Sequence, residues 1–289
     1  MPSRLTMLAI LAFWLAATGW FAARDIAPHW RAGDPPPYTI ELADEAMRNL
    51  LPVRWTLSRN GKPLGVVRTH LRYSAADDNY ELSAEAPEIV LLDIVLLKVV
   101  ASNFRDVVCV SRDGELRATH TYVQLRATGP LNGTFTASLD AVVARNQLLR
   151  RCTLVSPGIG EFSPTLEPIA QVHGSILNPL HPVPRITGLR LGQRWRQPLV
   201  APHGDILRAA LAQLPGGDKA AALAEQGPKS LDAEVREGTM PWNSQTHDCF
   251  VIEFRGDEFL ARVWVDKADG LVLRQEADSH GETMRLERE

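Results

Sequence analysis

The chain of 289 residues is 45% hydrophobic and 22% charged, a globular composition that excludes a disordered chain. Its 31 basic and 34 acidic side chains give a net charge of −3, which argues against a nucleic-acid binder, because such a protein needs a basic face. Three cysteines are too few for a disulfide framework.

The N-terminal segment is apolar enough to enter a membrane. Residues 5–23 carry no charge and lie between Arg4 and Arg24. As a helix they would reach ~28 Å, about the thickness of a bilayer core. We therefore predict that residues 1–24 form one transmembrane helix, a signal-anchor in the cell membrane that leaves the bulk of the chain extracytoplasmic (periplasmic). The alternative is a cleaved signal peptide with its cleavage site at Ala17-Thr18-Gly19.

Two further regions follow this segment. Residues 25–39 include the run Ala-Gly-Asp-Pro-Pro-Pro at 32–37. Proline-rich runs hold a chain extended, so a stiff linker is predicted here. Residues 40–289 are predicted to form one extracytoplasmic antiparallel β domain, large enough to bury its own core. A short helix is expected near its start, at 43–51.

Alternation of apolar and polar residues dominates the first part of this domain. Val53, Trp55 and Leu57 alternate with charged or hydroxyl residues, and the runs at 67–73, 80–85 and 134–141 do the same. This period of two is typical of strands with one buried and one wet face. Asn60-Gly61 is a strong signal for a tight hairpin turn. The predicted fold class is mainly β (α+β): a large curved antiparallel sheet or incomplete barrel with a few short helices, preceded by the transmembrane helix.

The segment from Ile89 to Val100 breaks this alternation. Only Asp93 and Lys98 interrupt its apolar residues, and it is too short to span a bilayer. We expect a buried helix or strand inside the fold. The alternatives are a lid over an apolar cavity and a segment that touches the membrane.

The centre of the domain differs from its end. Residues 156–184 are rich in proline and glycine, which predicts a long connection. A turn into a strand is expected at 189–200, and two short helices at 205–214 and 219–225. From residue 231 onwards, short runs separated by tight turns predict five more strands of the antiparallel sheet.

No constellation of residues predicts catalysis. The sequence lacks Gly-x-Ser-x-Gly, a phosphate-binding glycine loop, His-Glu-x-x-His and a paired-cysteine zinc motif. The His-Asp-Cys run at 247–249 lies in a strand pattern, where neighbours point to opposite faces. His173, His181 and His203 match no compact ligand spacing. We therefore predict no enzymatic activity, no catalytic residue, no metal site and no cofactor.

Buried positions are expected for the cysteines and for one histidine. Cys109, Cys152 and Cys249 lie in apolar runs and are expected to be small buried hydrophobes. One disulfide with a spare thiol is the alternative, since an exported compartment permits it. His120 falls on the same side as Leu116 and is expected to be a core histidine.

Two hairpin sequences resemble known families. Arg-Val-Trp-Val-Asp-Lys-Ala-Asp-Gly-Leu-Val-Leu-Arg-Gln-Glu at 262–276 resembles the Trp-Val-Asp … Gly-x-x-x-Arg hairpin of the LolA/LolB-like lipoprotein carriers. Trp-Thr-Leu-Ser-Arg-Asn-Gly-Lys-Pro-Leu-Gly at 55–65 resembles the first hairpin of a related uncharacterised periplasmic group. The resemblance implies an incomplete antiparallel barrel with helices over its open side and an apolar cavity. Neither motif is catalytic.

These observations lead to a predicted function. We expect a membrane-tethered, extracytoplasmic, non-enzymatic protein that binds a lipid or other apolar ligand in its curved sheet. The expected partners are the membrane, through the N-terminal helix, and a lipid or acyl chain, with no nucleic acid. The alternative is an envelope structural or assembly factor that binds a protein partner. The expected ligand-binding wall consists of Val53, Trp55, Leu57, Leu71, Tyr73 and Phe135.

Overall fold

The computed structural model describes most of the predicted β domain. The described residues are Trp14, 42–48, 51–94, 97–112, 115–128, 132–145, 147–157, 160–163, Leu166, 168–170, 181–198, 230–257, 259–279 and 281–289. The predicted transmembrane helix (apart from Trp14), the linker at 25–39 and the helices expected at 205–214 and 219–225 lie outside them and stay predictions. Within the described part of the chain, no helix is both long and apolar enough to cross a membrane.

The described residues form one antiparallel sheet of fifteen strands, which confirms the predicted large antiparallel sheet; two short strands, at 160–162 and 169–170, lie in the stretch predicted to be a connection. The order is β10-β11-β12-β13-β14-β15-β1-β2-β3-β4-β5-β6-β7-β8, with β9 also paired to β7. The strands are β1 (Val53–Arg59), β2 (Lys62–Ser74), β3 (Asn79–Ile94), β4 (Leu97–Ser111), β5 (Leu116–Thr128), β6 (Gly133–Ala144), β7 (Gln147–Ser156), β8 (Gly160–Phe162), β9 (Ile169–Ala170), β10 (Arg194–Pro198), β11 (Ser230–Trp242), β12 (Gln245–Gly256), β13 (Phe259–Asp266), β14 (Val272–Ser279) and β15 (Glu282–Arg288).

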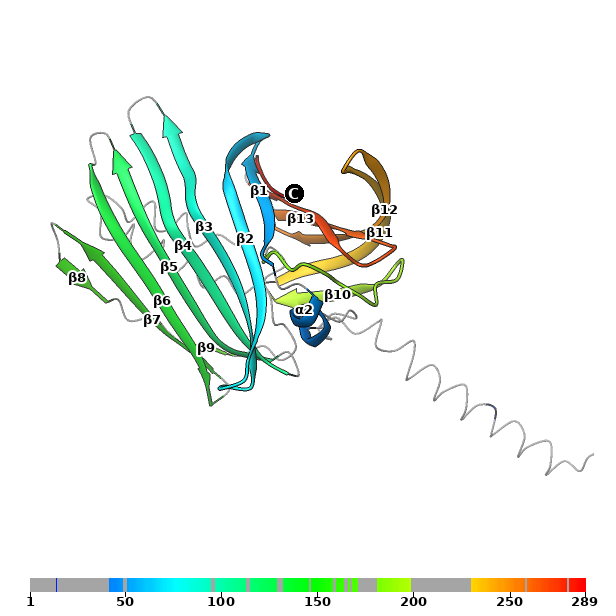
Figure 1. Ribbon diagram of the computed structural model, residues 1–289, viewed down its shortest axis with the longest axis horizontal. Coiled ribbons are helices and arrows are strands. Elements are labelled where there is room, and N and C mark those ends of the chain that lie inside the picture. The colour runs from blue at the N-terminus through cyan, green and yellow to red at the C-terminus, as the bar shows by residue number, and fades with distance from the viewer. Residues whose placement is uncertain are drawn as a thin grey trace, which may run out of the picture.

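The sheet has two arms that meet at β1. We call β2–β8 the first arm and β10–β15 the second arm; Figure 1 shows the long strands of the first arm as a fan and the more strongly curved second arm beside it. One buried apolar cluster contains Leu82 and Val108 from the first arm and Phe254 and Val263 from the second. The two arms therefore share a hydrophobic core.

Two of the connections that the structure describes in full are two-residue hairpin turns. The predicted turn between β1 and β2 is confirmed: Asn60 and Gly61 have φ of 49° and 79°, the positive values that a two-residue hairpin needs. A second such turn, at Asn243 and Ser244 with φ of 48° and 63°, joins the end of β11 at Trp242 to the start of β12.

The segment from Ile89 to Val100 is neither a helix nor one buried strand, so that prediction is wrong. It contains the ends of β3 and β4, which stay paired up to Ile94 and Leu97 at the tip of a long hairpin. Leu91 is 36% exposed near this tip, whereas Ile89 and Val100 at its base are buried. The run of apolar residues hid the turn, because no glycine, proline or asparagine marks it.

A short helix and one connecting segment complete the core. Helix α2 (Leu42–Arg48) places Leu42 in the shared apolar cluster. Residues 181–189, which we call the inner strap, lie between the arms. Their backbone bonds the second arm, where Ile186 N donates to Gly270 O (2.9 Å) and Val272 N donates to Pro184 O (3.1 Å).

Candidate ligand-binding site

The six predicted ligand-binding residues lie on one face of the sheet, which we call the inner face. Cross-strand partners share a face, and the pairs Leu71–Leu82, Leu82–Val108, Val108–Thr119 and Thr119–Ala141 connect β2 to β6. Residues at alternate positions then belong to the same face. The five predicted residues on β1 and β2 are nevertheless separated from Phe135 by three strands.

Trp55 and Leu71 belong to the core between the arms. Trp55 is 0% exposed, its Nε1–H donates to Thr69 Oγ1 at 2.9 Å, and the Arg288 guanidinium lies 5.8 Å from its ring centre. Leu71 is also buried. Both side chains are already covered, while Val53 and Leu57 are half-buried.

Tyr73 lies at the rim of the sheet, outside any wall. Its ring is 40% exposed, and its hydroxyl bonds Asp78 and accepts a hydrogen bond from Arg112 Nη2 at 2.8 Å. The Tyr73 hydrogen bond, assisted by the Arg112 guanidinium, lowers the pKa of the Asp78 carboxyl. This exposed cluster ties the β2–β3 turn to the end of β4.

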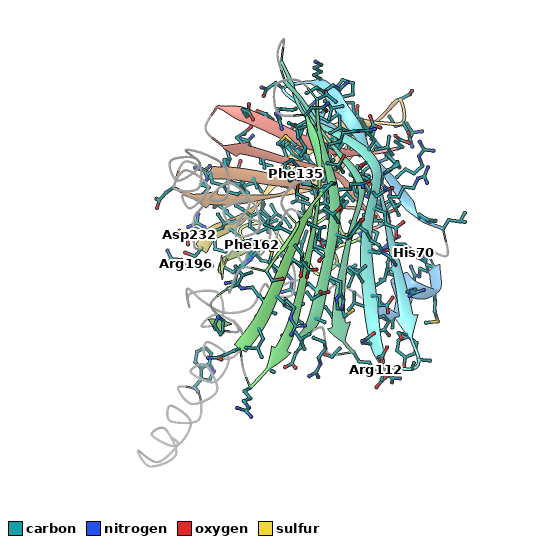
Figure 2. All side chains as sticks on the ribbon, turned by 90° about the vertical axis from the view of Figure 1, so that its left-hand side faces the viewer. His70, Arg112, Phe135, Phe162, Arg196 and Asp232 are labelled. Carbon is teal, nitrogen blue, oxygen red and sulfur yellow. The ribbon has the colours of Figure 1, made fainter. Side chains whose placement is uncertain are left out.

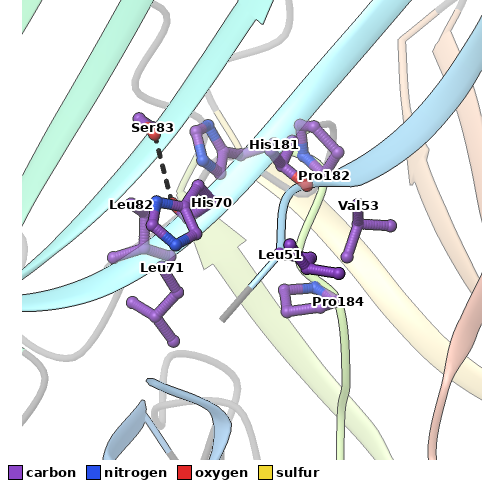
Figure 3. A pocket seen from close by; sticks show the side chains of 10 residues that line it. Leu51, Val53, His70, Leu71, Leu82, Ser83, His181, Pro182 and Pro184 are labelled. Atoms are coloured by element: carbon purple, nitrogen blue, oxygen red, sulfur yellow. Dashed lines mark hydrogen bonds between the residues drawn. The ribbon is translucent and has the colours of Figure 1, made fainter. Parts of the chain in front are cut away.

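A small pocket opens where the inner strap crosses β2 and β3 (Figure 3). Its volume is about 10 Å³, enough for about one water molecule and far too little for an acyl chain. It is lined by Leu51, Val53, Thr69, His70, Leu71, Leu82, Ser83, His181, Pro182 and Pro184. His70 is half-buried beside this pocket.

Phe135 belongs to a different apolar surface, farther along the first arm. Leu125 pairs with Phe135, Val123 pairs with Ala137, Ala137 pairs with Leu154, and Leu154 pairs with Phe162. Together with Phe104 on β4, these side chains form a continuous band; Ala137 within it is buried, Phe162 is 36% exposed and the others are half-buried. Phe104, Val123 and Leu125 pack against the shared core at one side of the band. Figure 2 shows His70 and Phe162 toward opposite borders of the first arm, in the order of their strands. We call this band the apolar strip: Phe104, Val123, Leu125, Phe135, Leu154 and Phe162.

A group of polar side chains adjoins the apolar strip on the same face. Thr121 Oγ1 donates to Asp106 Oδ1 at 2.7 Å, and His181 Nδ1 of the inner strap lies 3.7 Å from Asp106 Oδ2. Thr119, two residues before Thr121 on β5, is also buried, and its Oγ1 has no hydrogen-bond partner among the described residues. We call Asp106, Thr119, Thr121 and His181 the polar cluster. The sequence gives no local signal for it, because its members come from two strands and a distant connection.

The comparisons with known proteins leave the family of this chain open. No protein-family model matches the sequence, and no curated protein matches it. One solved structure that resembles the chain is described as a beta-barrel-like protein of domain of unknown function DUF1849 from Brucella abortus. The two share 10% identity with a TM-score of 0.38 over 83% of this chain and 96% of that one. At this TM-score the similarity supports no conclusion about the family or function of this chain. The resemblance to LolA and LolB stays a prediction.

A histidine–aspartate pair lies on the other face of the second arm. His247 Nδ1 is 2.6 Å from Asp266 Oδ2, and the Ala268 N–H donates to Asp266 Oδ1 at 2.7 Å. Burial, assisted by Asp266 and Asp248, raises the pKa of the nearby Cys249 thiol to about 11, which disfavours the thiolate form. The residue that meets His247 is thus Asp266 across the ladder. In the sequence, only the Trp-Val-Asp run that ends β13 points to Asp266.

The remaining predicted polar and thiol residues have simple positions. Cys109, Cys152 and Cys249 are all buried and none is in a disulfide. His120 is not a core residue: its side chain is 51% exposed on the outer face, with Nδ1 2.8 Å from Asp140 Oδ1. Among the described residues, no group of three or more His, Cys, Asp or Glu side chains could hold a metal ion.

The outer face of the second arm carries paired charges. Glu253 is the centre of one group, with guanidinium nitrogens of Arg255, Arg236 and Arg262 at 2.7, 3.3 and 3.5 Å from its carboxylate. Burial alone would raise the pKa of Glu253, but these guanidinium groups outweigh it and the pKa is lowered. Arg196 and Asp232, labelled in Figure 2, form a similar exposed pair at 2.8 Å.

Proposed function

We propose that the protein is a membrane-tethered, extracytoplasmic binding protein without enzymatic activity. Its inner face would hold a lipid or another apolar ligand against the apolar strip. The predicted anchor at 1–24 would keep this face close to a membrane, the source of such ligands.

One contrast within the inner face supports this proposal most. Leu82 and Leu139 on this face are 3% and 0% exposed, whereas the members of the apolar strip are only half-buried or exposed. A contiguous apolar surface that the fold leaves partly open is characteristic of sites for apolar ligands or partners. The protonated Cys249 thiol and the absence of catalytic motifs favour binding over a reaction.

A second function is favoured by the outer face of the first arm. Tyr122, Val142, Leu149 and Val155 on β5–β7 are 41%, 49%, 45% and 41% exposed. An envelope structural or assembly factor would use this outer apolar surface to bind a protein partner. The two functions thus use opposite faces of the same strands.

Site-specific photo-crosslinking separates the two functions. A photoreactive benzoylphenylalanine would replace either Phe135, on the inner face of β6, or Val142, on its outer face, in cells that make the full-length chain. The proposal predicts a lipid-sized mass increase at position 135 and none at 142. Protein adducts at 142 without a lipid adduct at 135 would support the assembly factor and contradict the lipid-binding proposal.

A further inference from the structure

We propose that the ligand is a single-chain amphiphile with a hydroxyl group at its polar end, and that Thr119 and Asp106 bind this hydroxyl. This inference deepens the proposed function and rests on it. The apolar strip would hold the chain and the polar cluster its polar end.

The positions of the residues support this division. The inner-face residues follow each other along β5 as Thr119, Thr121, Val123 and Leu125, from polar to apolar. On β4, Asp106 and Phe104 repeat the same order. At ~3.4 Å per residue, the distance from Thr119 to Leu125 is ~20 Å. One leaflet of a bilayer core is about 15 Å thick, so the site has the length of a membrane acyl chain.

The unpartnered Thr119 hydroxyl points to a polar ligand group. Thr119 is 6% exposed, and its Oγ1 has no hydrogen-bond partner in the part of the chain that the structure describes, although it is shielded from water. A buried hydroxyl without a hydrogen bond costs about 1–3 kcal/mol, so native structures rarely keep one without a reason. The other threonine of the cluster, Thr121, is satisfied through Asp106.

The charge of Asp106 selects the chemistry of that group. Asp106 pairs with Thr121, and diagonal neighbours on one face lie about 7–8 Å apart, so one ligand oxygen can reach both Asp106 and Thr119. A hydroxyl can donate to the Asp106 carboxylate and accept from Thr119. An ionised carboxylate or phosphodiester has no proton to donate to Asp106. An ammonium group could donate to both Asp106 and Thr119 but would leave the Thr119 proton without an acceptor, whereas a hydroxyl serves both residues.

Matched probes test the inference on the full-length chain, held in solution by an amphipathic polymer so that no detergent competes. Dodecanol and tridecane have the same number of non-hydrogen atoms but differ in the hydroxyl. In Thr119→Val, we expect the dissociation constant of dodecanol to rise about three- to tenfold relative to that of tridecane, because one neutral hydrogen bond is lost. Tridecane affinity should be unchanged.

Thermal unfolding of the empty protein provides the matched control. Thr119→Val removes an unpartnered hydroxyl and should leave Tm unchanged or higher, whereas Thr121→Val breaks the bond to Asp106 and should lower Tm. An unchanged probe ratio in Thr119→Val, or a Tm loss equal to that of Thr121→Val, would overturn the inference alone. Failure of wild type to bind either probe would instead overturn the proposed function.

Discussion

Replacing Glu45 by glutamine should destabilise the protein by about 3 kcal/mol. Glu45 on α2 is 3% exposed, and its Oε2 lies 3.2 Å from Arg185 Nε of the inner strap. Burial lowers the pKa of Arg288, and the Glu45 charge opposes that decrease. Glutamine keeps the size of the side chain but leaves both arginines without this carboxylate. Removing one partner of a buried ion pair costs about 3–5 kcal/mol, and the partial exposure of Arg185 favours the lower end.

Thermal unfolding of the full-length chain, followed by circular dichroism, would measure this cost. For a domain of this size we expect Tm to fall by about 6–12 °C. The control is Asp44→Asn on the same helix, where Asp44 is 50% exposed and pairs with Arg48 at 3.3 Å. Such an exposed pair contributes about 0.5 kcal/mol or less, so Tm should change by about 2 °C at most. Equal small changes in Tm in both variants would refute the stabilising contribution of the buried Glu45 carboxylate.

Three further predictions concern the two arms. Gly65→Ala would place a Cβ atom in a steric clash with the backbone oxygen of Glu88, so we expect a loss of about 2 kcal/mol by denaturant unfolding; Gly133→Ala, whose nearest contact would be an ordinary 3.6 Å, is the tolerated control. Cys249 should resist alkylation at pH 8 in the folded protein, since its thiol pKa is about 11, and rapid labelling without unfolding would contradict this. Glu253→Gln should cost about 1 kcal/mol at pH 7. Because the pKa of Glu253 is lowered in the fold, the difference in unfolding free energy between wild type and Glu253→Gln should shrink below about pH 4. A difference that grows below that pH would contradict a lowered pKa for Glu253.

Many of the strands could be predicted because they have one wet face. In β13, Ala261, Val263 and Val265 are buried on one face and alternate with Arg262 and Trp264, as the sequence pattern indicates. The prediction for residues 89–100 was wrong for the opposite reason. The strands of this hairpin carry apolar residues at nearly every position, so neither a period of two nor a turn residue shows where the chain reverses.

The candidate site was predictable only in part, because alternation gives the face of a strand but not what covers it. Trp55 and Phe135 fit the same apolar pattern, yet the core between the arms buries Trp55 completely while Phe135 stays half-buried. The shared core to which Trp55 belongs also contains Val183, Ile186 and Leu189 of the inner strap. The strap comes from residues 181–189, in a proline-rich stretch with no periodicity, so its position against Asp106 has no signal in the sequence.

The large apolar side chains that are exposed on the described strands, among them Tyr122, Val142 and Phe162, all lie in the first arm, and under the proposed function this arm carries the binding surface. In the second arm, Val235, Phe254 and Val263 are at most 2% exposed on the inner face, and charged groups such as Glu253 and its arginines cover the outer face. In the first arm, the strands farthest from β1 keep partly open apolar residues on both faces. Open apolar surface costs free energy in water, at about 25 cal/mol per Å². A well-packed second arm can compensate for that cost within one sheet, so the first arm can carry the open surface that, in the proposed function, a ligand or partner would cover.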